Sequence, residues 1–205
     1  MANDDFPRGL FPINLDIPSQ VHYYRASSGT DIYIGDPVYL APTGYVTIGS
    51  AVCSGVPYLG SAVGFLDTDK AGLPSDDPFL DVSDLAPKTG GRKAGDVWIA
   101  VADDPNQMFL IQEDTGGTAL ALADVGNSID LIRRTTVGNT ETGWANIELD
   151  ASTTATTTSG GFQILGLADT VNLDGSNNAV GDYAKWVVKI YHHQRAGGNA
   201  AVGIV

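Results

Sequence analysis

The chain has 205 residues, and its 11 Lys and Arg against 24 Asp and Glu give a formal net charge of −13. A chain of this length can bury a core as one domain without cross-links, and its single cysteine, Cys53, excludes an intramolecular disulfide. The acidic charge repels phosphate backbones, so we expect no nucleic-acid partner. Because Cys53 lies in a mostly apolar stretch, we expect it to be a buried structural thiol.

The sequence also lacks the apolar segments that direct a chain into or across a membrane. Its first residues are acidic, unlike those of a signal peptide, and no run approaches the roughly 18 apolar residues of a membrane span. Gly accounts for 25 of the 205 residues, whereas Lys and Glu, which build exposed helices, are scarce. We therefore expect synthesis in the cytoplasm, no membrane partner, and a fold of strands and turns.

Residues 1–20 predict an extended N-terminal arm. Pro7, Pro12 and Pro18 are interspersed with large apolar residues in a pattern that has neither helical nor strand periodicity. Exposed apolar side chains on such an arm promote aggregation. We therefore expect the arm to pack against its own domain or against a neighbouring molecule.

Strand signals bounded by turn residues begin at Val21. They cover residues 21–26, 32–40 with an interruption at 35–37, 45–48 and 58–66. Residues 67–94 break this rhythm with prolines, a cluster of aspartates and the cations Lys88, Arg92 and Lys93. We expect a long loop at about 67–94, of the kind that often serves as a binding element.

Two apolar runs, residues 97–102 and 108–111, flank a turn that extends from Asp103 to Asn106. The turn sequence is Asp-Asp-Pro-Asn, and these residue types close short chain reversals. The pattern therefore predicts a hairpin.

One helix and three further strands follow. Residues 118–125 are rich in helix formers and end at Gly126, so they predict a helix of about two turns. Strands are expected at residues 144–149, 162–167 and 184–191. In the last of these, Ala184, Trp186, Val188 and Ile190 alternate with more polar residues, which is typical of a strand with one face in the core.

Together these elements predict an all-β fold. We expect a single β-sandwich or β-barrel domain over residues 21–205, preceded by the extended N-terminal arm at 1–20 and including one short helix.

The three histidines do not form a metal-site pattern. His192 and His193 are adjacent, and neighbouring residues on an extended strand point to opposite faces, so one strand cannot direct both at one ion. His22 has no Cys or carboxylate at a ligand spacing. We therefore expect no metal site of the zinc type.

An oxygen-rich segment at residues 172–178 raises the question of calcium. It lacks the alternating carboxylates and the terminal Glu of a calcium-binding loop, so we expect a solvated turn. Calcium binding by aspartates of the long loop, such as Asp76 and Asp77, stays open.

Motifs for catalysis are missing from the sequence. It contains no nucleophile elbow, no phosphate-binding loop and no dinucleotide fingerprint, so we expect no enzymatic activity, no catalytic residue and no cofactor. A glycosidase pair made of Glu113 with Glu141 or Glu148 stays formally possible.

Three tryptophans could serve a different function. Trp98, Trp144 and Trp186 could form an aromatic platform for a sugar, but their apolar surroundings favour positions in the core.

Several segments resemble a family of tailed-phage virion proteins, the small accessory head proteins that decorate or cement the capsid. The similar segments are the opening Ala2-Asn3-Asp4-Asp5 and Gly9-Leu10-Phe11-Pro12, then Ile34-Gly-Asp-Pro-Val38, and residues 101–117, 148–153, 163–169 and 184–194. These motifs consist of structural residues, so the resemblance transfers no catalytic or ligand-binding residue.

The resemblance implies a non-enzymatic structural protein that is synthesised in the host cytoplasm and resides on the capsid exterior of the virion. Its expected partner is the major capsid protein, whose subunit contacts it would stabilise. By analogy with decoration proteins in general we also expect a homo-oligomer, with a trimer favoured and a dimer possible.

Expected exposure suggests which residues contact the capsid. The candidates are Phe6, Leu10 and Phe11 of the arm and Lys88, Arg92 and Lys93 of the long loop. Two alternative functions stay open: a carbohydrate-binding module displayed on the virion, and a structural component of the tail or of head completion.

Overall fold

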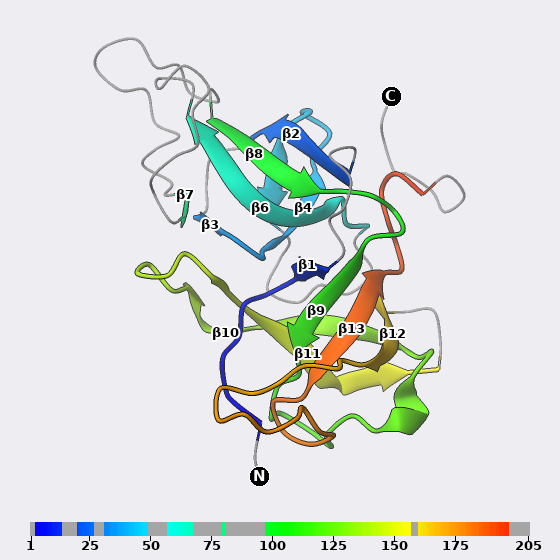
Figure 1. Ribbon diagram of the computed structural model, residues 1–205. Coiled ribbons are helices and arrows are strands. Elements are labelled where there is room, and N and C mark those ends of the chain that lie inside the picture. The colour runs from blue at the N-terminus through cyan, green and yellow to red at the C-terminus, as the bar shows by residue number, and fades with distance from the viewer. Residues whose placement is uncertain are drawn as a thin grey trace.

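The computed structural model describes residues 3–13, 20–26, 31–48, 57–67, 79–80, 97–156 and 160–196. Within these ranges the fold is all-β, as predicted. Two antiparallel sheets pack against each other as a sandwich and do not close into a barrel (Figure 1). No helical segment in the described ranges has the length and hydrophobicity of a membrane span.

The strands divide into a six-stranded sheet, a five-stranded sheet and one small pair. The six-stranded sheet consists, in spatial order, of β1 (Phe11–Ile13), β9 (Met108–Gln112), β13 (Lys185–Ile190), β12 (Phe162–Leu167), β10 (Ser128–Gly138) and β11 (Ala145–Ala155). The five-stranded sheet consists of β2 (Val21–Arg25), β8 (Val97–Ala102), β6 (Gly60–Asp67), β4 (Pro37–Leu40) and β5 (Val46–Ile48). The small pair is β3 (Ile32–Tyr33) with β7 (Phe79–Leu80).

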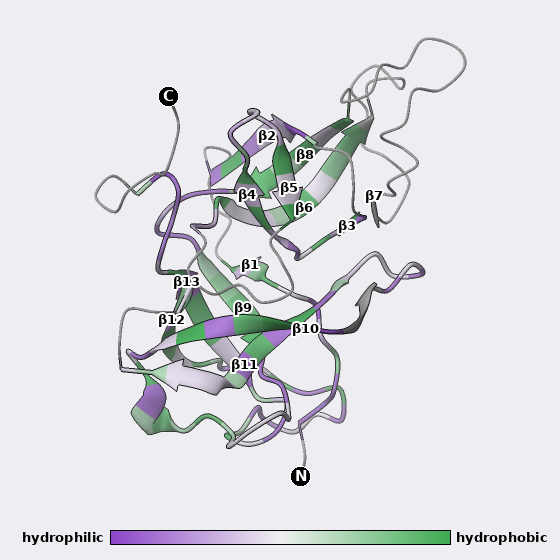
Figure 2. Cartoon of the chain, turned by 180° about the vertical axis from the view of Figure 1, so that it is seen from behind, coloured by the Kyte–Doolittle hydropathy of each residue, from purple (hydrophilic) through white to green (hydrophobic). Residues whose placement is uncertain are grey.

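Strand β13 shows how alternation in the sequence builds the core. Trp186, Val188 and Ile190 are buried, whereas Lys185 and Lys189 are only half-buried. The predicted apolar face of this strand is therefore confirmed. Figure 2 shows the same division on a larger scale, because hydrophobic residues concentrate on the strands of both sheets and hydrophilic residues on the segments that connect them.

The hairpin predicted around residues 103–106 is wrong. A turn does form there, since the amide of Gln107 donates to the carbonyl of Asp104 at 2.9 Å. However, β8 pairs with β2 and β6, whereas β9 pairs with β1 and β13. The chain thus crosses from one sheet to the other, because turn residues specify a change of direction but not the partner of the next strand.

The crossing is held by the carboxylate of Asp103, which is fully buried. His22 Nδ1 lies 2.7 Å from one of its oxygens, and Arg195 donates to the other at 2.6 Å. The hydroxyl of Tyr24 donates to the same carboxylate. Strand β2 and the segment that follows β13 are therefore fixed to the point where the chain changes sheets.

The helix expected at residues 118–125 is shorter than predicted. A single 3-10 turn, η4 (Leu122–Asp124), is present, and it buries none of its residues. Leu122 and Val125 are exposed, and Leu120 is the one residue of 118–125 that is buried in the core, so this segment has no continuous apolar face to stabilise further helical turns.

Residues 3–13 lie against both sheets rather than projecting from them. Leu10 is fully buried, its amide donates to the carbonyl of Gly35 at 2.8 Å, and its carbonyl accepts from the hydroxyl of Ser61 at 2.6 Å. Gly9 approaches Gly35 so closely that a Cβ on Gly9 would lie 2.3 Å from the Gly35 carbonyl oxygen. Only glycine fits this crossing, which positions residues 6–8 at the surface.

A buried ion pair joins the two sheets near this crossing. Asp36, in the turn between β3 and β4, is fully buried, and Arg133 on β10 donates to it at 2.8 Å. The amide of Tyr33 donates to the second carboxylate oxygen at 2.8 Å. Burial raises the pKa of Asp36 to about 6, although Arg133 acts in the opposite direction.

Replacing Arg133 tests this junction. We expect Arg133→Met to lower the free energy of unfolding by about 3–5 kcal/mol in urea titrations, because Asp36 loses its buried counter-ion. Adding Asp36→Asn should restore part of the loss. The control Arg25→Met removes an exposed arginine of β2 and should cost less than about 0.5 kcal/mol. Equal losses for the two arginine variants would contradict the role of the pair.

Candidate functional site

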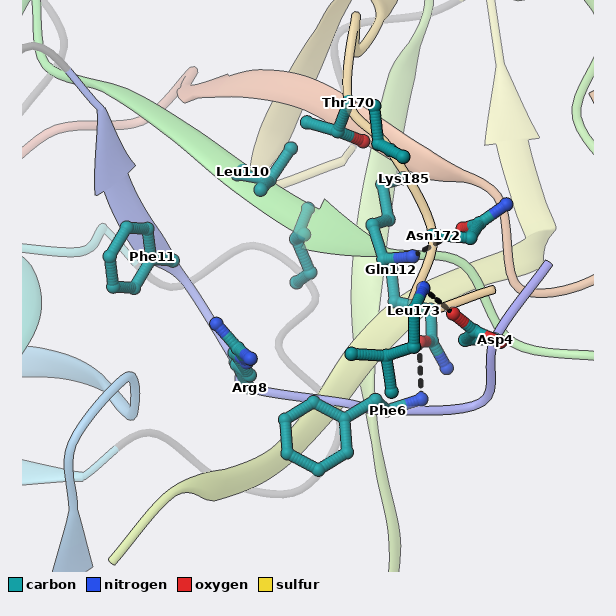
Figure 3. A pocket seen from close by; sticks show the side chains of 13 residues that line it. Asp4, Phe6, Arg8, Phe11, Leu110, Gln112, Thr170, Asn172, Leu173 and Lys185 are labelled. Carbon is teal, nitrogen blue, oxygen red and sulfur yellow. Dashed lines mark hydrogen bonds between the residues drawn. The ribbon is translucent and has the colours of Figure 1, made fainter. Parts of the chain in front are cut away.

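The candidate site is a hollow of about 240 Å³ between the N-terminal segment and residues 170–173, which we call the N-terminal groove. Phe6, Arg8 and Phe11 line it on one side, and Leu173 and Lys185 line it on the other (Figure 3). The two sides come from opposite ends of the sequence. The groove therefore exists only in the folded chain.

The start of the N-terminal segment is fastened to the loop between β12 and β13. The Asn3 side chain donates to the carbonyls of Ala179 at 2.8 Å and Asp182 at 3.0 Å, and it accepts from the amide of Ala179 at 3.1 Å. The carboxylate of Asp4 accepts from the amide of Leu173. These bonds hold both walls of the groove at a fixed separation.

Gln112, which is buried at the end of β9, fixes the next part of the segment. Its carbonyl oxygen accepts from the amide of Phe6 at 2.9 Å, and its amide group donates to Asp5 at 3.1 Å and to Glu148 at 2.7 Å. Arg134 on β10 completes the network through ion pairs with Asp5 and Glu148. Burial raises the pKa of Glu148, while Arg134 and Gln112 oppose this shift.

Large apolar side chains around the groove are exposed to solvent. The exposed fractions are 41% for Phe6, 38% for Phe11, 64% for Val171 and 82% for Leu173. Side chains of this size are normally covered in a monomer when they cluster, so this cluster is a candidate interaction surface.

Two cations lie among these apolar groups. The guanidinium of Arg8 lies 4.7 Å from the ring centroid of Phe6 and 5.5 Å from that of Trp144. Lys185 donates to the side-chain oxygen of Asn172 at 2.9 Å. Burial lowers the pKa of Lys185; Asp4 opposes this shift and Arg8 adds to it. Within the described part of the chain, neither cation forms an ion pair.

A second hollow, of about 510 Å³, adjoins the first across the N-terminal segment. Phe6 lines both hollows, and Trp144, Asn139 and Asn146 line only the second. The Trp144 ring packs on Phe11, with the ring centroids 5.9 Å apart. The segment from Phe6 to Arg8 is thus a ridge between two depressions.

The predicted capsid-contact residues differ in their exposure in the structure. Phe6 and Phe11 are exposed at the N-terminal groove, as the prediction requires. The prediction that Leu10 is exposed to a partner is wrong, because Leu10 is fully buried in the core. Lys88, Arg92 and Lys93 lie outside the described residues, as do Cys53, Asp76 and Asp77.

Sequence reasoning missed Arg8, Val171, Leu173 and Lys185. Residues 172–178 are predicted as a solvated turn, and Leu173 and Asp174 are indeed exposed, but Asn172 is buried against the N-terminal segment. The sequence did contain one indication of this site: the large apolar residue Leu173 stands in an otherwise polar segment that is expected to be exposed.

The other sequence candidates do not gather into one site. Trp186 is buried in the core and donates to Glu113, Trp98 on β8 lies under the guanidinium of Arg25, and Trp144 packs on Phe11. Among the residues that the structure describes, no group of three or more His, Cys, Asp or Glu side chains could hold a metal ion.

Comparisons with known proteins identify no relative of this chain. No protein-family model, no curated protein and no solved structure matches this chain.

Glu113 gives a pH-dependent prediction. One of its buried oxygens accepts from the amide of Leu120 at 3.0 Å and from Trp186 at 3.2 Å, and the other has no partner among the described residues. Burial raises the pKa of Glu113 from 4.5 to about 7. The neutral form is therefore favoured by folding, and its stabilisation is complete below pH 4.5 and lost as the pH rises through 7.

Glu113→Gln should remove this dependence. At about pH 8 the variant should be more stable than the parent chain by on the order of 2 kcal/mol, and at about pH 4 the two should be alike. Denaturant titrations across this range measure the difference. Glu141→Gln, which alters an exposed carboxylate, is the control, and a parallel pH profile for both variants would contradict the assignment.

Gln112→Leu tests the attachment of the N-terminal segment. Loss of the buried hydrogen bonds should cost about 1–3 kcal/mol of stability and should accelerate hydrogen exchange at the amide of Phe6 at least about tenfold. Gln163→Leu is the matched control, because among the described residues the side chain of Gln163 makes one exposed hydrogen bond, to the carbonyl of Gly126. Unchanged exchange at Phe6 would show that Gln112 does not hold the segment.

Proposed function

We propose that this chain is a non-enzymatic structural protein of a tailed-phage virion that binds the outside of the assembled capsid. Its partner is the major capsid protein, and it stabilises contacts between neighbouring subunits as a homo-oligomer, with a trimer favoured. The observation that carries the proposal is the exposed apolar cluster of Phe6, Phe11, Val171 and Leu173 around the N-terminal groove. The similarity of the sequence segments to capsid decoration proteins supports the same function.

The mechanism is thermodynamic linkage. A protein that binds the assembled lattice but not free subunits stabilises the lattice by mass action, and several attachment points in an oligomer strengthen its retention. The rigid attachment of the N-terminal segment suits this task, because a surface that is already ordered loses little entropy on binding. The net charge of −13 favours the outer face, away from packaged DNA.

Cosedimentation tests the proposal. Purified protein is mixed with undecorated mature heads of the phage that encodes it and, separately, with unassembled capsid subunits. We expect saturation at a copy number set by the capsid symmetry on heads alone. Binding in only a few copies would instead favour a tail or head-completion component, and no binding to heads would refute the proposal.

A surface variant locates the contact. Phe6→Ser combined with Phe11→Ser should weaken binding to heads at least about tenfold, because two exposed apolar anchors are lost. Tyr23→Ser is the control: Tyr23 is an aromatic residue of β2 that is 53% exposed and lies in the other sheet. Equal binding by both variants would exclude the N-terminal groove as the contact surface.

Glycan binding is a second candidate function. It rests on Trp144, which lines the second hollow beside Asn139 and Asn146, a combination of aromatic and amide groups that suits a sugar. A glycan array distinguishes the two functions. Specific glycan binding that is lost in Trp144→Ala, with no binding to heads, would favour this candidate.

A further inference from the structure

The charges at the N-terminal groove differ from those of the chain as a whole. The chain has 24 acidic against 11 basic residues, yet Arg8 and Lys185 both line this one hollow. Most other described arginines are neutralised: Arg133 pairs with Asp36, Arg134 with Asp5 and Glu148, and Arg195 with Asp103.

Neither groove cation forms an ion pair in the described part of the chain, although the charge of Asp4 acts on Lys185 from a distance. Arg8 rests on the rings of Phe6 and Trp144, and Lys185 bonds to the neutral side chain of Asn172. Asp4 lines the same hollow, accepts from the amide of Leu173 and keeps its negative charge, so the lining holds two cations against one carboxylate. The groove therefore has positive charge available for a negatively charged ligand group.

The walls and the size of the groove restrict what that ligand is. Phe6, Phe11, Val171 and Leu173 provide large exposed apolar surfaces beside the cations. The volume of about 240 Å³ lies below the roughly 300–1,000 Å³ of sites that enclose a small molecule or cofactor. A hollow of this size accepts a few side chains. In addition, the hydroxyl of Thr170, which lines the groove, is buried without a hydrogen-bond partner among the described residues.

From this combination we infer that the N-terminal groove binds an extended peptide segment in which a carboxylate side chain stands next to large apolar side chains. The carboxylate contacts Arg8 and Lys185, and the apolar side chains cover Phe6, Phe11 and Leu173. This inference rests on the proposed function in one respect: in the virion, the segment belongs to a capsid subunit.

Peptide selection on the purified full-length protein tests the inference. A displayed library of random peptides is selected on the immobilised chain, and the enriched peptides are synthesised and titrated by fluorescence anisotropy. We expect them to share an Asp or Glu next to Phe, Leu, Ile or Trp. Changing that acid to its amide should weaken binding about tenfold or more, as should Arg8→Glu in the protein.

Matched variants keep the result interpretable. Arg8→Gln removes the charge without reversing it and should show a smaller loss in the same direction, while thermal melts verify that both Arg8 variants are folded. Lys189→Glu alters the same strand as Lys185 but not a groove residue, and it should bind the peptides like the parent chain. Amide resonances of Val171 and Leu173 should shift on binding.

Two results would overturn the inference. One is enrichment of peptides without an acidic residue, and the other is binding that Arg8→Glu leaves unchanged. The outcome is separable from that of the proposed function. If heads bind the chain but no acidic and apolar peptide is enriched, this inference fails and the function stands. If such peptides bind the groove and heads do not bind, the capsid function fails and the peptide site stands.

Discussion

The buried carboxylate of Asp103 is the interaction on which this two-sheet structure depends. A charged group without access to water requires donors on every side, and here they come from His22 and Tyr24 on β2 and from Arg195 beyond β13. Because Asp103 lies where the chain leaves one sheet for the other, satisfying it fixes how the sheets meet. Asp36 and Arg133 add a second buried link between the sheets, so that the sandwich is held by charge pairs as well as by its two apolar cores.

The N-terminal groove follows from this arrangement. Leu10 anchors the N-terminal segment between the sheets, and the side-chain oxygen of Gln112 accepts a hydrogen bond from the amide of Phe6. Because Leu10 occupies the core position of this segment, the side chains of Phe6, Arg8 and Phe11 stay at the surface. The exposed rings of Phe6 and Phe11, and the cations that form no ion pair among the described residues, lie on a backbone that is fixed by these contacts, and a surface that is already ordered loses less entropy on binding.

The sequence led us to expect Phe6, Leu10 and Phe11 to be exposed, whereas the structure exposes Phe6 and Phe11 and buries Leu10. All three are large apolar residues in a proline-interrupted segment, and no local pattern distinguishes the one that enters the core. The close contact between Gly9 and Gly35 determines that Leu10 enters the core, and these two glycines are distant in sequence. Leu173 was missed for a related reason, since its neighbours in sequence are polar and its neighbours in space are Asp4 and the N-terminal segment.

The sequence by itself determined the all-β class and the positions of most strands. Alternation and turn residues are local properties, so the strands at residues 97–102 and 162–167 were predicted with the bounds that the structure gives to β8 and β12. Only the tertiary structure decided which strands pair, and it replaced the predicted hairpin by a crossing between sheets. It also reduced the predicted helix to one 3-10 turn and built the groove from the two ends of the chain. Those outcomes depend on long-range packing and on the burial of charges such as Asp103, which no local pattern contains.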